Sequence, residues 1–246
     1  MNATHLGDRL RRRFGEIPDV PAALGDVALA RALAGRASCR RFTDRPVAPE
    51  LLRALAALAL GAPSKSDLQQ ADLVLVTDPL LRAALAATVA EQDWVRAAPA
   101  LVVVCGNNRR QRQVHDLRGH AFANDHLDAF FNAAVDGAIV LAAYVLAAEA
   151  AGLGACPVSG LRDQPERVSA LLGLPAHVFP VAGIGLGWPA APAAISPRLP
   201  LALTVHENRW SEPDVAAAIA AYDARRRQHH PYRQERDTAR FGHDPA

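Results

Sequence analysis

The sequence predicts an α+β fold in which a small central sheet is packed with long helices, within one domain that spans residues 1–246. Short apolar runs indicate buried strands. They are separated by longer segments in which leucine and alanine recur at helical spacing. The chain also has no internal repeat and no long linker, so nothing in the composition indicates a second domain.

The beginning of the chain is predicted to be helical. Residues 1–26 form a basic helix at 5–15 and a proline-broken connector, and a second helix covers 27–34. The clearest helix starts near Pro49 and ends at Gly61, because proline suits the first helical turn and glycine follows the last one. The leucines between these two residues share one side at helical spacing.

The middle of the chain supplies two of the three predicted strands. Residues 73–77 form the first strand, and a helix follows from Pro79 to about residue 90. The second strand, 100–105, is an unbroken apolar run, which indicates burial on both faces. The segment 107–120 is strongly polar, and we expect it to be mobile.

The rest of the chain adds the longest helix and the third strand. The long helix is predicted from about 125 to 151, and a shorter one covers 163–173. The third strand lies at 181–187. Residues 189–246 form a C-terminal excursion and basic tail, which is rich in proline at first and contains a last helix at roughly 212–227.

Composition favours an ordinary cytoplasmic protein. Of the 246 residues, 50% are hydrophobic and 21% are charged, and the formal net charge of +2 calls for neither nucleic acid nor membrane. The three cysteines lie far apart without a CxxC pair, so we expect no disulfide framework. The N-terminus lacks the apolar core of a secretory signal, and the most apolar stretch, 138–148, is too short to span a bilayer.

Two apparent motifs are better explained as structure. The glycines of GIGLGW, residues 183–188, follow GxGxG rather than GxGxxG, and the prolines after them prevent the helix that a dinucleotide site needs. We expect these glycines to let another backbone approach the strand closely. His115, His120 and His126 have no recognised metal-binding spacing, so we expect a solvated loop and no metal.

Positive charge is concentrated in GRASCRR, residues 35–41. Arg36, Ser38 and Arg40 alternate, so an extended turn would place their side chains on one side. Two guanidinium groups and a hydroxyl are suitable ligands for a phosphate. The residues alone leave open a second interpretation, in which the arginines are solvated or pair with nearby carboxylates.

Five segments follow one another in a fixed order across about residues 27–210: RASCRRFTDRPV, GAPSKSDLQQADLVLVTD, AAEAAGLGACPVSGLRDQPERVSALLGLP, FPVAGIGLGWPA and SPRLPLALTVHENRW. Each is a modest motif, but together they resemble the nitroreductase family of flavoproteins, especially its NADPH-dependent, oxygen-insensitive branch. The resemblance implies a nitroreductase-like fold with a mostly antiparallel sheet. It also implies an intertwined homodimer that binds FMN non-covalently at the interface.

The same resemblance assigns cofactor-binding residues by position. The residues that match phosphate and ribityl contacts are Arg36, Ser38, Arg40 and Arg198. The residues that match positions around the flavin ring are Ser64, Asp67, Gln92, Pro157, Val158, Ser159 and Gly160. No side chain is expected to act as a catalytic acid or base, because hydride transfer takes place at flavin N5 and needs correct positioning only.

The activity implied by the resemblance is hydride transfer from NADPH, or NADH, to nitroaromatic, quinone or flavin acceptors by a ping-pong mechanism. Two alternatives are a dedicated dehydrogenase or flavin reductase of a biosynthetic pathway and a non-catalytic flavin-binding protein. A nucleic-acid-binding protein is the weakest alternative, because no aromatic stacking platform accompanies the arginines. No nucleic acid, membrane or metal partner is expected.

The chain departs from the family pattern at several positions. Asp67 replaces the usual asparagine, and an aspartate beside the flavin would lower its reduction potential. Ser196 replaces a lysine near the phosphate, Ser159 replaces a glycine, and 70–71 replace Pro-Trp. Several late arginines could read the 2′-phosphate of NADPH or could lie in a solvated tail: Arg225, Arg226, Arg227, Arg233 and Arg236.

Overall fold

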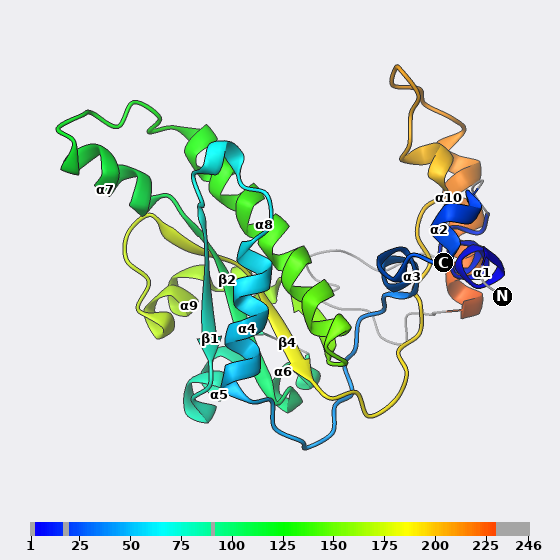
Figure 1. The fold of residues 1–246 in the computed structure, drawn as a ribbon, viewed down its shortest axis with the longest axis horizontal. Helices are drawn as coiled ribbons and strands as arrows, with labels where there is room; N and C mark the ends of the chain where they lie inside the picture. Colours follow the sequence, from blue (N-terminus) through cyan, green and yellow to red (C-terminus); the bar gives the residue numbers. More distant parts are fainter. Residues whose placement is uncertain (1–2, 17–19, 90–91, 230–246) are drawn as a thin grey trace. The chain divides into compact units, whose positions relative to one another are not determined.

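The structure, a computed structural model, describes residues 3–16, 20–89 and 92–229. The chain divides into two compact units (Figure 1). Unit 1 contains residues 1–37 and 194–246, and unit 2 contains residues 38–193. Two such units can belong to one domain, so the single domain over 1–246, with 1–26 and 189–246 as its terminal segments, stays a prediction.

Unit 2 is built on a four-stranded sheet with the order β1–β2–β4–β3, and every neighbouring pair is antiparallel. The strands are β1 (Ala71–Val76), β2 (Ala100–Asn107), β3 (Gly154–Val158) and β4 (Val178–Gly187). In the register of β2 with β4, Val102 lies opposite Ile184. This sheet, with the helices around it, confirms the predicted α+β fold class.

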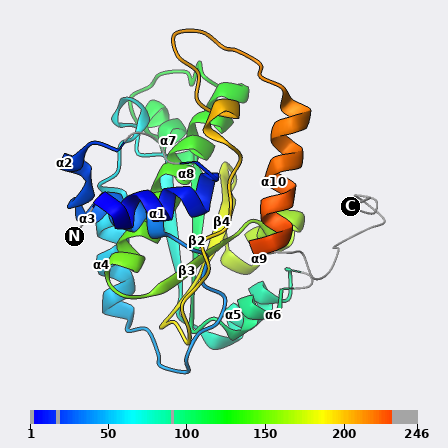
Figure 2. The same ribbon diagram turned by 90° about the vertical axis from the view of Figure 1, so that its right-hand side faces the viewer.

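Helices cover both faces of this sheet, as Figures 1 and 2 show. They are α4 (Pro49–Leu60), α5 (Pro79–Ala86), α6 (Asp93–Ala97), α8 (Leu127–Ala150) and α9 (Pro165–Leu172). A further helix, α7 (Arg109–Leu117), lies beyond the end of the sheet (Figure 1). Two short 3-10 turns are η1 (Lys65–Asp67) and η2 (Gly160–Asp163). α4 and α8 pack on one face, while α5, α6 and α9 pack on the other.

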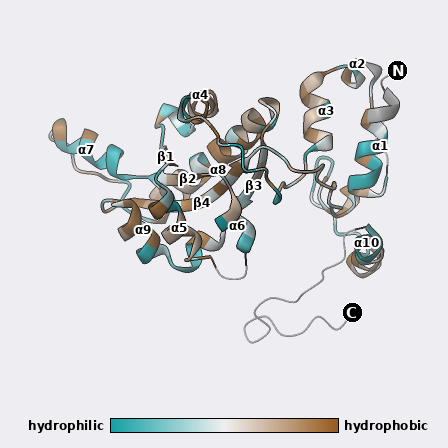
Figure 3. Cartoon of the chain, turned by 90° about the horizontal axis from the view of Figure 1, so that it is seen from below, coloured by the Kyte–Doolittle hydropathy of each residue, from teal (hydrophilic) through white to brown (hydrophobic). Residues whose placement is uncertain are grey.

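The core of unit 2 explains why β2 is apolar at successive positions (Figure 3). Val102 and Val104 face the cluster formed with α4 and α8, whereas Leu101 and Val103 face the cluster formed with α5, α6 and α9. All eight residues of β2 are buried, so the predicted burial on both faces is confirmed.

The glycines of β4 permit close packing on one face of the sheet. A Cβ atom at Gly183 would lie 2.7 Å from Leu161 Cδ1, and one at Gly185 would lie 2.7 Å from Trp94 Cζ3. The glycines therefore make room for side chains, and the expectation that a neighbouring backbone would approach them was wrong. The dinucleotide motif has no structural counterpart here, because Gly183 and Gly185 lie inside a strand that no helix follows directly.

Among the described residues, α8 is the one helix whose length and apolar composition would allow it to cross a membrane. The stretch 138–148 is only part of this apolar helix, so its length was underestimated from the sequence. Of its most apolar window, 44% is buried inside unit 2. Its buried positions include the polar residues Asn132 and Asp136. These are the features of a core helix that packs on a sheet.

Three local predictions were wrong. The polar segment 107–120 contains a regular helix, α7, whose polar side chains bind neighbouring elements. The short strand β3 was not predicted, because it contains both glycine and proline and shows no long apolar run. Helix α5 ends at Ala86 rather than near residue 90, and the Thr88 hydroxyl donates to the Leu85 carbonyl in the following turn.

Unit 1 is helical. Its helices are α1 (Ala3–Phe14), α2 (Ala22–Gly25), α3 (Ala28–Gly35) and α10 (Val215–His229), with a 3-10 turn η3 at Leu201–Leu203. Arg9 Nη1 on α1 donates to the Arg31 carbonyl on α3 at 2.7 Å. The predicted helices at 5–15, 27–34 and 212–227 are confirmed with small shifts of their ends. The basic tail with Arg233 and Arg236 lies outside the described residues.

Candidate functional site

Unit 2 contains a pocket of about 530 Å³ beside the start of β1. This volume is within the range of pockets that hold cofactors and small substrates. Its wall carries polar side chains from three regions of the chain, including Ser64, Asp67, Gln70, Asp72, Arg110 and Asp136. Two of the predicted ring-side residues, Ser64 and Asp67, therefore lie in one pocket wall.

The loop 64–70, between α4 and β1, has an unusual backbone. Ser66, Asp67 and Gln69 have φ angles of 50°, 56° and 50°, although none of them is glycine. L-amino acids enter this left-handed region only at a cost, because Cβ approaches the following carbonyl oxygen. Other contacts must therefore hold the loop in this shape.

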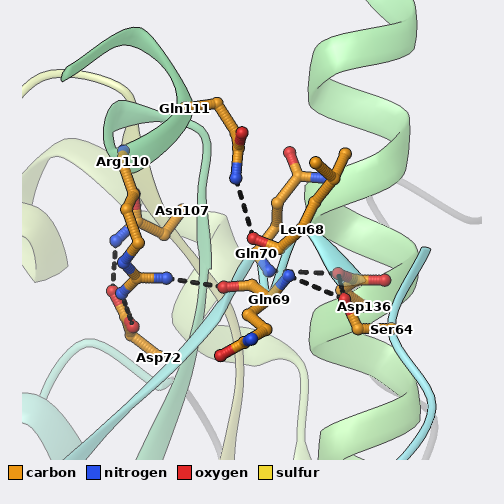
Figure 4. Close-up of polar contacts among 9 residues, drawn as sticks. All are labelled: Ser64, Leu68, Gln69, Gln70, Asp72, Asn107, Arg110, Gln111 and Asp136. Carbon is orange, nitrogen blue, oxygen red and sulfur yellow. Dashed lines mark hydrogen bonds and ion pairs between the residues drawn. The ribbon is translucent and has the colours of Figure 1, made fainter. Parts of the chain in front are cut away.

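A carboxylate of α8 binds this loop from the inside (Figure 4). Asp136 Oδ2 accepts hydrogen bonds from Ser64 Oγ at 2.9 Å and from the Gln70 backbone N–H at 3.0 Å. Its Oδ1 accepts one from the Lys65 backbone N–H at 3.1 Å. Ser64 Oγ in turn accepts a hydrogen bond from the Gln69 backbone N–H at 2.7 Å.

Helix α7 binds the same loop from the other side. Gln111 Nε2 donates to the Leu68 carbonyl at 2.8 Å, and the Arg110 guanidinium donates to the Gln69 carbonyl. Arg110 also forms an ion pair with Asp72, as Figure 4 shows. The helix that the sequence did not predict therefore helps to form the pocket wall.

Gln70 is the most buried residue of this loop, with 2% of its surface exposed. Its Oε1 accepts a hydrogen bond from Asn108 Nδ2 at 3.4 Å. Its Nε2 has no hydrogen-bond partner among the described residues. A buried amide donor without a partner thus lies in the residue that takes the place of the family's proline.

A second group of predicted residues meets at the start of α6. Gln92 Oε1 accepts a hydrogen bond from Trp94 Nε1 at 3.2 Å. A Cβ atom at Gly160 would lie 3.4 Å from Gln92 Nε2, an ordinary contact distance, and 2.9 Å from Val89 Cγ1, so a larger residue would have to displace the Val89 side chain. The Arg40 guanidinium lies 5.8 Å from the centroid of the Trp94 ring, within the range of a cation–π contact.

The predicted ring-covering residues occupy the end of β3 and the start of η2. Pro157 and Val158 are the last residues of β3, and the Val158 side chain is buried in the core. Ser159 is exposed and precedes the buried Gly160. Ser159 is therefore the exposed residue of this segment, and Pro157 is partly exposed.

The segment that carries Ser38 and Arg40 runs beside β3. The Cys39 backbone N–H donates to the Ala155 carbonyl at 3.0 Å. The Cys39 side chain packs on Gly154, where an added Cβ atom would lie 2.5 Å from Cys39 Sγ. This contact fixes the position of residues 38–40 in unit 2 relative to the strand that ends in the predicted ring-covering segment.

In unit 1, two predicted arginines from distant parts of the chain contact one residue, Arg13. The Arg13 guanidinium donates to the Arg36 carbonyl. The Arg198 backbone N–H donates to the Arg13 carbonyl at 2.6 Å. Arg198 Nη1 donates to Ser196 Oγ at 2.8 Å, so the residue at the family's lysine position binds the neighbouring arginine.

Two groups of unit 2, the Asp128 carboxylate and the Cys105 thiol, have shifted pKa values. The hydrogen bond from Asn132 and the charge of Lys65 lower the pKa of Asp128, which lies 3.7 Å from Lys65 Nζ. Burial raises the pKa of the Cys105 thiol to about 12, and the nearby charge of Asp72 acts in the same direction. Within the described residues, no three His, Cys, Asp or Glu side chains come together as a metal site.

Sequence reasoning missed Asp136, Arg110, Gln111 and Arg13. A signal existed for Asp136, because a carboxylate in the middle of an apolar helix needs buried donors. Arg110 and Gln111 gave no signal, because they lie in the strongly polar segment 107–120, which we expected to be mobile. Arg13 is one of several consecutive arginines, and only the structure distinguishes it by burial, with 8% of its surface exposed.

Comparisons with known proteins identify the family of this chain. The profile of the nitroreductase family matches residues 33–188, and the profile of that family's C-terminal domain matches residues 196–242. The chain is 37% identical over 191 residues to an oxygen-insensitive NADPH nitroreductase of Salmonella typhimurium, which covers 78% of either chain. It is 32% identical over 196 residues to an NAD(P)H FMN reductase of Bacillus subtilis, covering 78% of this chain and 79% of the relative.

A solved structure shows the same fold. The NADPH:FMN oxidoreductase from Vibrio harveyi, complexed with NAD⁺, has a TM-score of 0.77 to this chain and 29% sequence identity. The match covers 88% of this chain and 92% of the Vibrio chain. The likeness therefore extends over nearly the whole length of both proteins.

Proposed function

Because the chain belongs to the nitroreductase family, we propose that it is an FMN-dependent oxidoreductase that passes hydride from NAD(P)H to nitroaromatic, quinone or flavin acceptors. We further propose a ping-pong order, in which the nicotinamide leaves before the acceptor enters the same site. NADPH is the preferred donor, since relatives of the branch that the sequence resembles are named for NADPH.

Several contacts among the described residues support FMN as the cofactor. The observation that carries the proposal is the contact of both Arg36 and Arg198 with Arg13, because it brings phosphate-binding candidates from distant segments to one residue. The close approach of Gln92 to Gly160 supports a ring-side role for both. Gln70 lines the pocket of about 530 Å³, and its Nε2 has no hydrogen-bond partner among the described residues. This free donor supports the binding of a polar ligand in that pocket.

The residues of the chain would share the work of binding. Guanidinium groups of Arg36, Arg40 and Arg198 would neutralise the phosphate through charge-assisted hydrogen bonds. Gln92 would supply directed hydrogen bonds at the polar edge of the ring, and the backbone of 157–160 would line its face. FMN, when bound, supplies a group that can accept and return a hydride. The protein therefore needs to orient two substrates in turn and needs no general base.

Two substitutions in the family pattern would tune this site. Asp67 in the pocket wall places a carboxylate where it would disfavour negative charge on a reduced flavin, which lowers the reduction potential. Ser196 accepts a hydrogen bond from Arg198 and brings no charge, so the phosphate would be held by arginines alone. Both features are compatible with an active oxidoreductase of modest FMN affinity.

We also propose that the active form is a cytoplasmic homodimer with the flavin site at its interface. A group of exposed apolar side chains lies on α4 and α8: Leu58, Leu60, Leu127, Phe130, Phe131 and Val135. This is called the apolar surface below. Leu60 belongs to the pocket wall as well as to the apolar surface, so the pocket adjoins the face that a second copy would cover.

Visible absorbance of the purified protein tests the proposed function. We expect a yellow protein whose flavin absorbance is bleached by NADPH and restored by menadione. Initial rates with both substrates varied should give parallel double-reciprocal lines. A yellow protein that NAD(P)H cannot bleach would indicate a non-catalytic flavin-binding protein. A colourless protein that takes up no added FMN would contradict the proposal.

A further inference from the structure

The loop 64–70 combines an unfavourable backbone with a position in the pocket wall. Ser66, Asp67 and Gln69 all have left-handed φ angles. Non-glycine residues keep such angles only where surrounding contacts hold them there, and such segments cluster at ligand sites. Asp67 and Gln69 line the pocket together with the neighbouring Ser64, so the backbone of this loop determines where pocket groups lie.

One buried carboxylate meets the hydrogen-bond donors on both sides of the strained residues. Asp136 binds the Ser64 hydroxyl and the Lys65 N–H before them and the Gln70 N–H after them. Because Ser64 Oγ donates to Asp136, Asp136 also orients this oxygen, which accepts the hydrogen bond from the Gln69 N–H. Asp136 is 2% exposed and lies in the middle of α8, so it offers these acceptors from a rigid helix.

The contacts from α7 act on different atoms. Gln111 and Arg110 donate to the carbonyls of Leu68 and Gln69, and they come from α7, a helix in which no residue is fully buried. They bind only the second half of the loop. Among the described residues, Asp136 alone binds both ends of the strained stretch. Figure 4 shows its hydrogen bonds to Ser64 and Gln70.

We propose that Asp136 is a positioning residue, whose carboxylate holds the loop 64–70 in its left-handed shape and thereby fixes Ser64 and Asp67 in the wall of the cofactor pocket. The inference rests on the proposed function for its effect on FMN, but its effect on the loop is independent of any flavin. Asp136→Asn tests it, because the side chain keeps its size while one acceptor oxygen becomes a donor that faces an N–H or O–H group.

Amide hydrogen exchange of the flavin-free protein gives the first readout. In Asp136→Asn we expect peptides that contain residues 65–70 to exchange about tenfold faster or more, since a hydrogen bond to a charged group is lost. The matched control is Asp128→Asn, which alters another carboxylate of α8 that contacts the Lys65 side chain but no backbone N–H of the loop. The control should leave loop exchange unchanged. Equal loop exchange in wild type and Asp136→Asn would overturn the proposal.

FMN affinity gives the second readout, measured by quenching of flavin fluorescence on titration. We expect the dissociation constant to rise about tenfold or more in Asp136→Asn and to change less than about twofold in Asp128→Asn. Adding Ser66→Gly to Asp136→Asn should recover part of the affinity, because glycine adopts a positive φ without steric cost. Loss of affinity without any such recovery would indicate general damage to the core and would overturn the positioning role.

The two readouts separate this inference from the proposed function. If the wild-type protein bound no FMN, the proposed function would fail, while the exchange experiment would still decide whether Asp136 holds the loop. If the wild type bound FMN and Asp136→Asn bound it equally well, the proposed function would stand and the positioning role would be wrong.

Discussion

Arg36 and Arg198, from distant parts of the chain, are both hydrogen-bonded to Arg13. If their guanidinium groups bind the FMN phosphate, Arg36→Ala and Arg198→Ala should each weaken FMN binding by about 1.5–3 kcal/mol, the usual value of a hydrogen bond to a charged group. Titration of the flavin-free protein measures this change. Arg12→Ala is the control, since Arg12 is an exposed arginine of α1. Unchanged FMN retention in both test variants would contradict the phosphate assignment.

A second residue-scale prediction concerns pH. Burial raises the pKa of the Cys105 thiol from 9.0, the value of a free thiol, to about 12 in the folded protein. Between these two pH values the folded state therefore keeps its proton, whereas the unfolded state loses it. The unfolded state then binds fewer protons, and the free energy of unfolding should fall as pH rises from about 9 to about 12. Urea denaturation across this range measures the slope.

Cys105→Ala is the control for this slope, since it removes the thiol that titrates. In this variant the free energy of unfolding should fall less steeply with pH. Some of the fall should remain, because burial also raises the pKa of the Tyr144 phenol. In the native protein at about pH 8, the Cys105 thiol should resist iodoacetamide, because the reactive thiolate is scarce. Rapid native alkylation of Cys105 would contradict its burial.

Single residues were the least predictable level of this structure. The alternation of Arg36, Ser38 and Arg40 indicated a phosphate ligand, but only the family resemblance added Arg198, which is far away in the sequence. The sequence indicated that Asp136 needs buried donors, but it could not identify them, because they lie in a loop whose backbone conformation has no local signature. Such contacts depend on tertiary structure that no local pattern encodes.

At the scale of elements, apolar patterning predicted what the core determines. The strands β2 and β4 and the helix α8 were identified because burial on two faces, or along a long face, requires apolar residues at many positions. Helix α7 was missed because its polar side chains bind loops and carbonyl groups instead of a core. Strand β3 was missed because pairing with β4, rather than its own composition, makes it extended.

The packing of α6 on β4 gives an element-scale prediction. Gly185→Ala would place a Cβ atom 2.7 Å from Trp94 Cζ3, and a packed indole ring cannot move away freely. We expect the variant to lose about 1–3 kcal/mol of stability, the usual cost of overpacking a core. Chemical denaturation measures the loss, and near-UV circular dichroism should report a changed environment of Trp94.

A double-mutant cycle identifies the contact responsible. Trp94→Phe removes part of the ring that meets Gly185, so the double variant should be destabilised by less than the sum of the single variants. If the two effects simply added, steric overlap with Trp94 would not be the cause. A neutral Gly185→Ala would show that α6 can shift at little cost.

At the scale of the whole molecule, the family and the fold class were accessible from sequence because ordered motifs and core patterning extend along most of the chain. The division into two units was not, since residues 1–37 associate with 194–246 from the opposite end of the sequence. Contacts such as Leu201 N–H with Glu16 Oε1, at 2.7 Å, join these segments and have no local signature.

The apolar surface on α4 and α8 bears on the assembled molecule. Phe131 and Leu58 expose 61% and 68% of their surface, which is costly for large apolar side chains on neighbouring helices unless a partner covers them. The wild type should therefore have twice the 26.2 kDa mass of one chain when measured by light scattering. The double variant Leu58→Glu/Phe131→Glu should be monomeric, because two charges on that surface would be buried without partners.

Leu80→Glu is the matched control, since Leu80 is also highly exposed, at 79%, but lies on α5 outside the apolar surface. It should remain dimeric and retain FMN. The monomeric double variant should keep its helical circular dichroism while losing FMN, because the pocket adjoins the apolar surface at Leu60. A monomeric wild type, or a double variant that stays dimeric, would show that another face joins the subunits or that none does. A folded monomer that retained FMN would place the cofactor within one chain.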